Sequence, residues 1–186
     1  MIEGFGAVTL VGLWALAEAT VWPIMPDAVL VPLAAGRPAS WWRLVLAAAL
    51  GTTVGGAISY AVSRRRPDRD AIGRLPMVRP AMVAAADHWL ATEGPRGARH
   101  QPTTGVPMKV FARLAGLHGL PLGRFLLWAV AVRTLRFTLA AGGAALVGRA
   151  CRPVVQRWYW PLTLLWSIVF GVMLWRMVTY WSRRAG

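Results

Sequence analysis

The sequence is poor in the residues on which disulfide scaffolds, metal sites and common hydrolase sites depend. Its 186 residues include a single cysteine, Cys151, which excludes an intramolecular disulfide. The three histidines, His88, His100 and His118, do not have the spacing of metal ligands. The sequence also has no Gly-x-Ser-x-Gly, His-Glu-x-x-His or P-loop motif. We therefore expect no metal, no cofactor and no enzymatic activity.

Acidic residues and lysine are scarce as well. Seven Asp and Glu residues stand against 21 Lys and Arg residues, which gives a formal net charge of +14. Lys109 is the only lysine, and the arginines flank or interrupt apolar segments. Arginines in such positions set membrane topology and contact anionic lipid headgroups. We therefore expect membrane lipids as partners, and no nucleic acid.

Hydrophobic residues make up 56% of the chain, and the mean hydropathy is +0.48. Residues 40–62, 124–148 and 159–182 form apolar stretches that reach the ~20 residues needed to cross a bilayer. Tryptophan and tyrosine flank both ends of the last stretch, as in interfacial aromatic belts. Residues 1–4 lack a basic start, so we do not expect a cleaved signal peptide. These features predict an integral membrane protein with three transmembrane helices.

Two further apolar segments, 5–35 and 102–122, are interrupted by charge, proline and glycine. The first carries Glu18, Pro23, Pro26 and Asp27, and the second carries Gly105, Pro107, Lys109, Arg113 and Gly116. A charge in hydrocarbon usually marks a pathway, a pairing or a site. We interpret each segment as a re-entrant hairpin, in which a helix, a break and a second helix return to the same side. For the first segment, a single kinked transmembrane helix is the alternative.

The basic segment 63–100 sets the predicted topology. The positive-inside rule places this loop in the cytoplasm. Within the loop, residues 77–92 could form a short amphipathic helix, which would either dock on the bilayer surface or serve as a loose connecting helix. The C-terminus is then cytoplasmic, and the two hairpin-plus-helix units are inverted copies of each other. Five arginines fall on the outer side, so the charge rule supports this topology only moderately: Arg37, Arg43, Arg149, Arg152 and Arg157.

The predicted fold is therefore an all-α integral membrane protein with two inverted re-entrant helical hairpins plus three transmembrane helices. We assign residues 1–149 to one membrane domain and residues 150–186 to a segment that carries the C-terminal transmembrane helix. Within the predicted transmembrane helix over residues 40–62, Gly51, Gly55 and Ser59 recur every four residues, a pattern that lets another helix approach closely. Such small-residue stripes also permit a homodimer.

Several of these motifs, in this order, resemble the DedA family, also called the VTT-domain or SNARE-associated Golgi protein family, and within it the YqaA-type branch. The segment Glu18-Ala-Thr-Val-Trp-Pro23-Ile-Met-Pro26-Asp27 resembles its acidic, proline-rich first motif. Gly51-x-x-x-Gly55-Gly56-x-x-x-Tyr60 resembles the family's glycine–tyrosine helix. Gly105-Val-Pro107-Met-Lys109 resembles its second re-entrant motif, in the form that carries lysine, and Arg133-x-x-Arg136-Phe137 resembles its basic pair. The resemblance covers roughly residues 5–148.

The resemblance implies movement of lipids across the inner membrane of a bacterium. Members are proposed to act as scramblases or flippases of phospholipids, or as translocases of polyprenyl-phosphate carriers, some of them driven by the proton motive force. The chain departs from the family at Pro102, where many members carry an arginine. The preceding stretch, residues 92–101, is polar, so we expect the first arm of the second hairpin to be short or missing.

Five charged residues form the predicted substrate and proton pathway: Glu18, Asp27, Lys109, Arg133 and Arg136. Their excess of positive charge suits a phosphate headgroup, and a carboxylate in a low dielectric could carry a proton. Arg113 is expected to extend toward the cytoplasmic face. The first alternative is a membrane scaffold whose charges only pair, so that exchanging the charges of Asp27 and Lys109 would preserve function. The second alternative is an intramembrane enzyme acting on a lipid phosphate.

Overall fold

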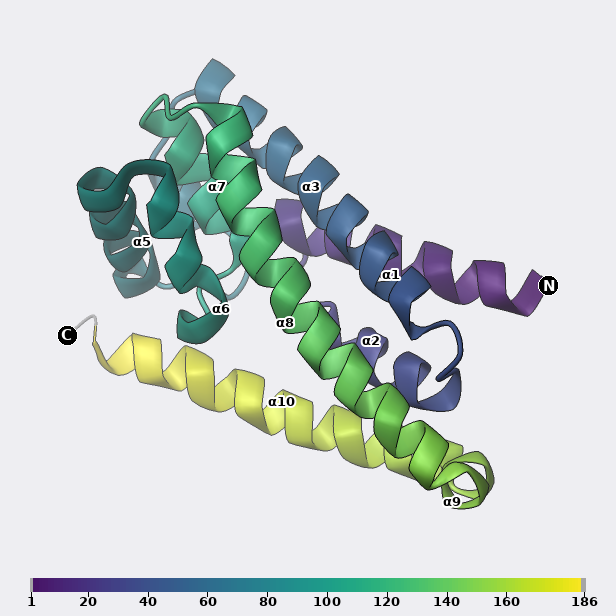
Figure 1. Ribbon diagram of the computed structural model, residues 1–186. Coiled ribbons are helices and arrows are strands. Elements are labelled where there is room, and N and C mark those ends of the chain that lie inside the picture. Colours follow the sequence, from purple (N-terminus) through teal and green to yellow (C-terminus); the bar gives the residue numbers. More distant parts are fainter. Residues whose placement is uncertain (1, 185–186) are drawn as a thin grey trace.

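The computed structural model describes residues 2–184, and side chains from residue 5 onward. All of its regular elements are helices (Figure 1), the long ones being α1 (Ile2–Thr20), α3 (Trp41–Arg65), α8 (Leu122–Ala150) and α10 (Tyr159–Arg183). The shorter ones are α2 (Asp27–Gly36), α4 (Asp70–Gly73), α5 (Pro80–Glu93), the 3₁₀ helix η1 (Gly94–His100), α6 (Gln101–Thr104), α7 (Met108–Leu117) and α9 (Arg152–Arg157).

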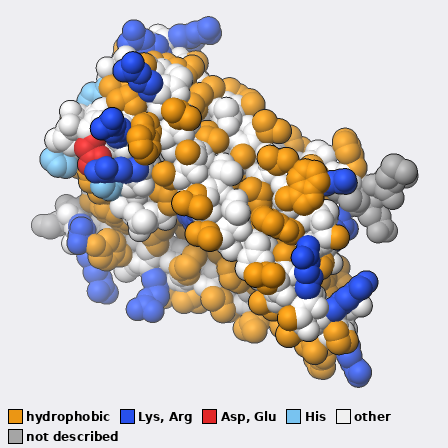
Figure 2. Space-filling model, in the orientation of Figure 1, with side chains coloured by type: hydrophobic (Ala, Val, Ile, Leu, Met, Phe, Trp, Pro, Cys, Tyr) orange, Lys and Arg blue, Asp and Glu red, His pale blue; other side chains and the backbone are white. Residues whose placement is uncertain are grey.

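Within the described residues, three helices are long and apolar enough to cross a membrane: α3, α8 and α10. They correspond to the three transmembrane stretches predicted from the sequence. Large apolar side chains are exposed at every fourth position of α3, from Leu46 through Leu50 and Val54 to Ile58, and along α8 and α10. Figure 2 shows hydrophobic side chains spread over the middle of one face and basic side chains toward its ends. This surface is that of a helical membrane protein.

The helices on either side of the two interruptions pack in a reciprocal way. Helix α1, before the first interruption, lies against α3, whereas α2, after it, lies against α8. Correspondingly, η1 and α6, before the second interruption, lie against α8, whereas α7, after it, lies against α3. In Figure 1, α3 and α8 run side by side from the upper left to the lower right of the view. Helices α3 and α8 therefore each pack against helices from both interrupted segments.

Both interruptions have a local cause in the sequence. Helix α1 ends at Thr20 because Pro23 and Pro26 lack the N–H groups that would continue it, and α2 begins at Asp27. The second interruption follows α6 at Gly105, whose φ of 72° favours glycine, and Pro107 then leads into α7 in an extended conformation. The sequence predicts that Gly116 belongs to this break, and this prediction is wrong. Gly116 lies inside α7 and packs closely on the Tyr60 backbone.

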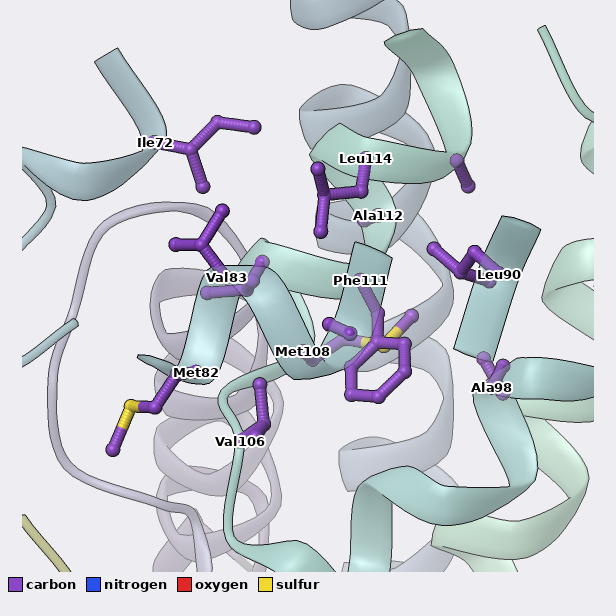
Figure 3. Close-up of a cluster of buried hydrophobic side chains, with 14 of the residues drawn as sticks. Ile72, Met82, Val83, Leu90, Ala98, Val106, Met108, Phe111, Ala112 and Leu114 are labelled. Atoms are coloured by element: carbon purple, nitrogen blue, oxygen red, sulfur yellow. The ribbon is translucent and has the colours of Figure 1, made fainter. Parts of the chain in front are cut away.

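Segment 63–100 contains α4, α5 and η1, and α5 corresponds to the short amphipathic helix predicted over residues 77–92. Met82, Ala86 and Leu90 recur along one face of α5 and are fully or almost fully buried in a core with Phe111 of α7 (Figure 3). The apolar face of helix α5 is therefore packed against the protein's own core, so α5 is not a loose connection. Together with η1 and α6 it precedes the second break, where the polar composition had predicted a short or missing arm.

The small-residue stripe of α3 packs against α1. A Cβ atom on Gly51 would overlap the backbone of Gly12, and one on Gly55 would overlap that of Leu16. Ser59 Oγ donates a 2.6 Å hydrogen bond to the Ala19 carbonyl, which satisfies a buried hydroxyl. The stripe is thus filled by the chain's own first helix, and a second copy could not occupy it.

Candidate functional site

The end of α1 and the middle of α8 are joined by a buried ion pair. Glu18 Oε2 lies 2.6 Å from Arg133 Nη2, and the two side chains are only 1% and 4% exposed. The other carboxylate oxygen, Oε1, accepts a 3.3 Å hydrogen bond from the Met108 N–H at the start of α7. The Arg133 guanidinium also lies 5.2 Å from the centre of the Phe137 ring. Glu18 therefore holds three helices, α1, α7 and α8, together.

A second ion pair lies one helical turn further along α8. Asp27, in the first turn of α2, accepts a 3.0 Å bond from Arg136 Nη2, and the Arg136 guanidinium also contacts Met25 Sδ at 3.6 Å. The Asp27 side chain is 7% exposed and the Arg136 side chain 26% exposed. An acidic side chain is favourable at a helix N-terminus, so Asp27 is stabilised by α2 as well as by Arg136. This pair is more accessible than the first.

Lys109 is fully buried, and its partners are backbone carbonyls. Its ammonium donates to the carbonyl oxygens of Val21 at 3.0 Å, Trp22 at 3.1 Å and Pro76 at 3.2 Å. Val21 and Trp22 directly follow the C-terminus of α1, where carbonyls lack helical partners. Lys109 therefore holds the backbone of the first break. It does not form an ion pair with Asp27, which pairs with Arg136 instead, so exchanging the charges of Asp27 and Lys109 would not test the scaffold alternative.

The second break is held by two polar side chains that the sequence analysis missed. The buried Gln101 amide donates a 3.0 Å bond to the Val106 carbonyl across the break. The Trp181 indole N–H, near the end of α10, donates a 3.1 Å bond to the Thr104 carbonyl. A polar residue beside the Pro/Gly break could have marked Gln101, but nothing local in the sequence links Trp181 to a residue 77 positions away.

A cavity of about 310 Å³ lies between the two breaks. It is lined by Met25 from the first break, by Thr104 and Gly105 from the second, by Arg136 from α8, and by α10. The α10 residues in the lining are Phe170, Met173, Leu174 and Met177. Arg136 is the one charged residue among the described residues of this lining, whereas Arg133 and Glu18 do not line it. Arg136 of the second ion pair thus faces a space that neither residue of the first pair reaches.

Arg113, the remaining charge of the second segment, lies on α7 and is partly exposed. Its buried Nε has no hydrogen-bond partner, and it does not join either ion pair. The structure therefore brings together Glu18 with Arg133 and Asp27 with Arg136, places Lys109 beneath the first break, and leaves Arg113 apart.

A third cluster lies outside the three long apolar helices. The Asp87 carboxylate of α5 bonds His118, at the end of α7, at 2.8 Å and Arg69 at 2.6 Å. Burial acts to raise the pKa of Asp87, but the bonds from His118 and Arg69 outweigh it and hold this pKa below its ordinary value of 3.8. The cluster fastens α5 to α7. In the described part of the chain, no group of three His, Cys, Asp or Glu side chains is placed to hold a metal.

Comparison with known proteins gives one informative match. The chain is similar to an uncharacterized protein of Haemophilus influenzae (strain Rd), with 26% identity over 160 residues, which covers 84% of this chain and 83% of that protein. No protein-family model and no solved structure matches the chain. The function must therefore be inferred from the geometry of the site.

Proposed function

We propose that the protein moves anionic lipids across the bilayer, as a scramblase or translocase of phospholipids or polyprenyl-phosphate carriers. The observation that carries this proposal is the cavity between the two breaks, which has Arg136 as its charged lining residue. A guanidinium binds a phosphate through two parallel hydrogen bonds. The headgroup would pass along Arg136 while the acyl or prenyl chains stay in the surrounding lipid.

The same proposal also assigns the shorter helices to two re-entrant hairpins in the membrane. Helices α1 and α2 would form one re-entrant hairpin, the arm from α5 to α6 would form the second with α7, and the two would enter from opposite sides. The reciprocal packing on α3 and α8 supports inverted repeats, which in transporters place the site between broken helices. We also propose membership of the DedA family, YqaA-type branch, in a bacterial inner membrane with a cytoplasmic C-terminus.

Asp27 and a phosphate would compete for the Arg136 guanidinium. While Asp27 is ionised, its 3.0 Å bond engages Arg136. Protonation of Asp27 would weaken that bond and release the guanidinium for the headgroup, which couples transport to a proton. Glu18 is poorly suited to this role, because both of its carboxylate oxygens have partners and its side chain is almost wholly buried.

A scaffold that uses its charges only to hold the helices together is the second candidate. It is favoured by one observation, namely that Glu18, Asp27 and Lys109 all have close partners in the structure. A scaffold predicts no lipid movement by well-folded protein, and it predicts that Arg136 matters only for stability.

The proposal is tested by lipid scrambling in proteoliposomes that carry a trace of fluorescent phosphatidylglycerol. Charge-assisted hydrogen bonds contribute about 1.5–3 kcal/mol, so Arg136→Gln should slow scrambling by about tenfold or more. Arg124→Gln, an exposed arginine on the same helix, is the matched control and should scramble at the wild-type rate. Equal rates for Arg136→Gln and the control would contradict a site at Arg136. If folded wild-type protein does not scramble phosphatidylglycerol, a transport assay with polyprenyl phosphate would separate a carrier-lipid translocase from a scaffold.

A further inference from the structure

A second cavity, of about 460 Å³, lies where α2, α3, α8 and α9 meet. Its polar lining consists of Arg37, Ser40, Arg149, Arg152 and Gln156. Arg149 is 13 residues from Arg136 on α8, a separation of about 20 Å along the helix axis. The second cavity is therefore distinct from the space between the two breaks.

Two arginines of this cavity, Arg149 and Arg152, have no acidic side chain beside them among its described lining residues. No aspartate or glutamate is among its described lining residues, and the sequence has none between Asp27 and Asp68 or after Glu93. None of the ion pairs in the described part of the chain includes Arg149 or Arg152. Arg149 donates one bond to the Pro38 carbonyl at 2.9 Å, which fixes its guanidinium at the cavity and leaves other N–H groups to donate.

The start of α3 adds a second source of positive potential. Ser40 lines the cavity at the point where this 25-residue helix begins, and its side chain makes no capping hydrogen bond. The first N–H groups of a helix lack backbone partners, and the helix dipole makes this end attractive to anions. Arginine side chains and the N-cap residue of a helix therefore line the same space, and both features occur at phosphate sites.

The surroundings of the cavity are those of a membrane interface. Trp158 and Trp160, which follow α9, are both exposed, and Tyr159 borders the adjoining hollow. Exposed aromatic residues of this kind collect at the level of lipid headgroups. Leu146 and Val147, on the last turns of α8, expose apolar side chains beside Arg149 along which acyl chains could lie.

We propose that this cavity binds the phosphate group of an anionic phospholipid. The bound lipid would neutralise the arginines at this end of the molecule, where the proposed topology has positive charge on the outer side. The site does not depend on the proposed transport function, because a scaffold or a transporter could hold such a lipid equally well. Free phosphate offers the same chemistry, so the test must separate the two sources.

The test is native mass spectrometry of the full chain, delipidated and then mixed with phosphatidylglycerol or phosphatidylcholine. Wild type should retain phosphatidylglycerol in preference to phosphatidylcholine, and the double variant Arg149→Gln/Arg152→Gln should weaken that binding by roughly tenfold. Arg157→Gln, an exposed arginine of α9 outside the cavity, is the matched control and should bind as wild type does. The double variant Arg149→Lys/Arg152→Lys keeps the charge and should bind phosphatidylglycerol at an intermediate level. If the glutamine variant fails to fold, this lysine variant provides the comparison with wild type.

Inorganic phosphate is then added as a competitor. If phosphate does not displace phosphatidylglycerol, the site takes a lipid headgroup as proposed. If phosphate displaces the lipid from wild type and the control alike, the cavity is an anion site for free phosphate and the lipid assignment is wrong. Equal binding of phosphatidylglycerol by the folded glutamine variant and by Arg157→Gln would overturn the site altogether.

Discussion

The two ion pairs on α8 differ in burial and in the partners of their carboxylates. Glu18 and Arg133 are almost wholly buried, and the carboxylate has an additional backbone partner. Asp27 and Arg136 lie one turn away and are more exposed, and Arg136 lines a cavity between the two breaks. Similar residue types thus form a pair that holds three helices together and a pair whose arginine, in the proposed function, would exchange Asp27 for a phosphate. Burial and partner number distinguish the two, whereas the sequence motif does not.

Breaking the buried pair should have the largest effect on stability. Glu18→Gln leaves the Arg133 charge buried without compensation, which typically costs about 3–5 kcal/mol. The double variant Glu18→Leu/Arg133→Leu removes both charges and should regain most of that loss. Chemical denaturation in detergent micelles measures both variants. A Glu18→Gln protein as stable as wild type would show that this pair does not hold the helices.

Lys109→Met should have the next largest effect. It removes a buried donor and leaves the carbonyls of Val21, Trp22 and Pro76 without their shared partner, at a cost of about 2–3 kcal/mol. Arg113→Met, on the same helix, is the control and should change the free energy of unfolding by less than about 1 kcal/mol, because Arg113 joins neither ion pair. The same denaturation experiment compares the two, and equal losses would contradict the role given to Lys109.

Asp27→Asn should have a small effect on stability and a large effect on transport. Asparagine can still accept a hydrogen bond from Arg136, and the Arg136 side chain is partly exposed, so we expect a loss of about 1 kcal/mol. Because asparagine does not titrate, the rate of lipid scrambling should lose its dependence on pH. Scrambling is measured across a pH series beside wild type, and an unchanged pH profile would remove Asp27 from the proton step.

Asp87→Asn should have the smallest effect, because its cluster is on the surface and such pairs contribute about 0.2–1 kcal/mol. The lowered pKa means that the ionised carboxylate is favoured in the folded state. This stabilisation is present above the unfolded value of 3.8 and is lost as the pH falls through the lower folded value. Denaturation of the variant should therefore depend less on pH below about 4 than denaturation of wild type.

The sequence predicted the parts of this fold that depend on composition and pattern. Three long apolar stretches became α3, α8 and α10, and the charges at Glu18, Asp27, Arg133 and Arg136 proved to be close together. The partners of Lys109 could not be predicted, because backbone carbonyls at the end of a helix leave no signal of their own in the sequence. Helix α5 was predicted as a short amphipathic helix over residues 77–92, but its packing against α7 was not, because the polar and basic residues around it indicated an exposed loop.

The most direct test of the central claim compares two folded variants in one scrambling assay with labelled phosphatidylglycerol. Arg136→Gln removes the cavity-facing arginine and keeps the buried pair, whereas Glu18→Leu/Arg133→Leu removes the buried pair and keeps the cavity-facing one. Lipid movement should be lost in Arg136→Gln and retained in the double leucine variant. Retained movement in Arg136→Gln, with loss in the double leucine variant, would contradict the account and move the functional site to the buried pair.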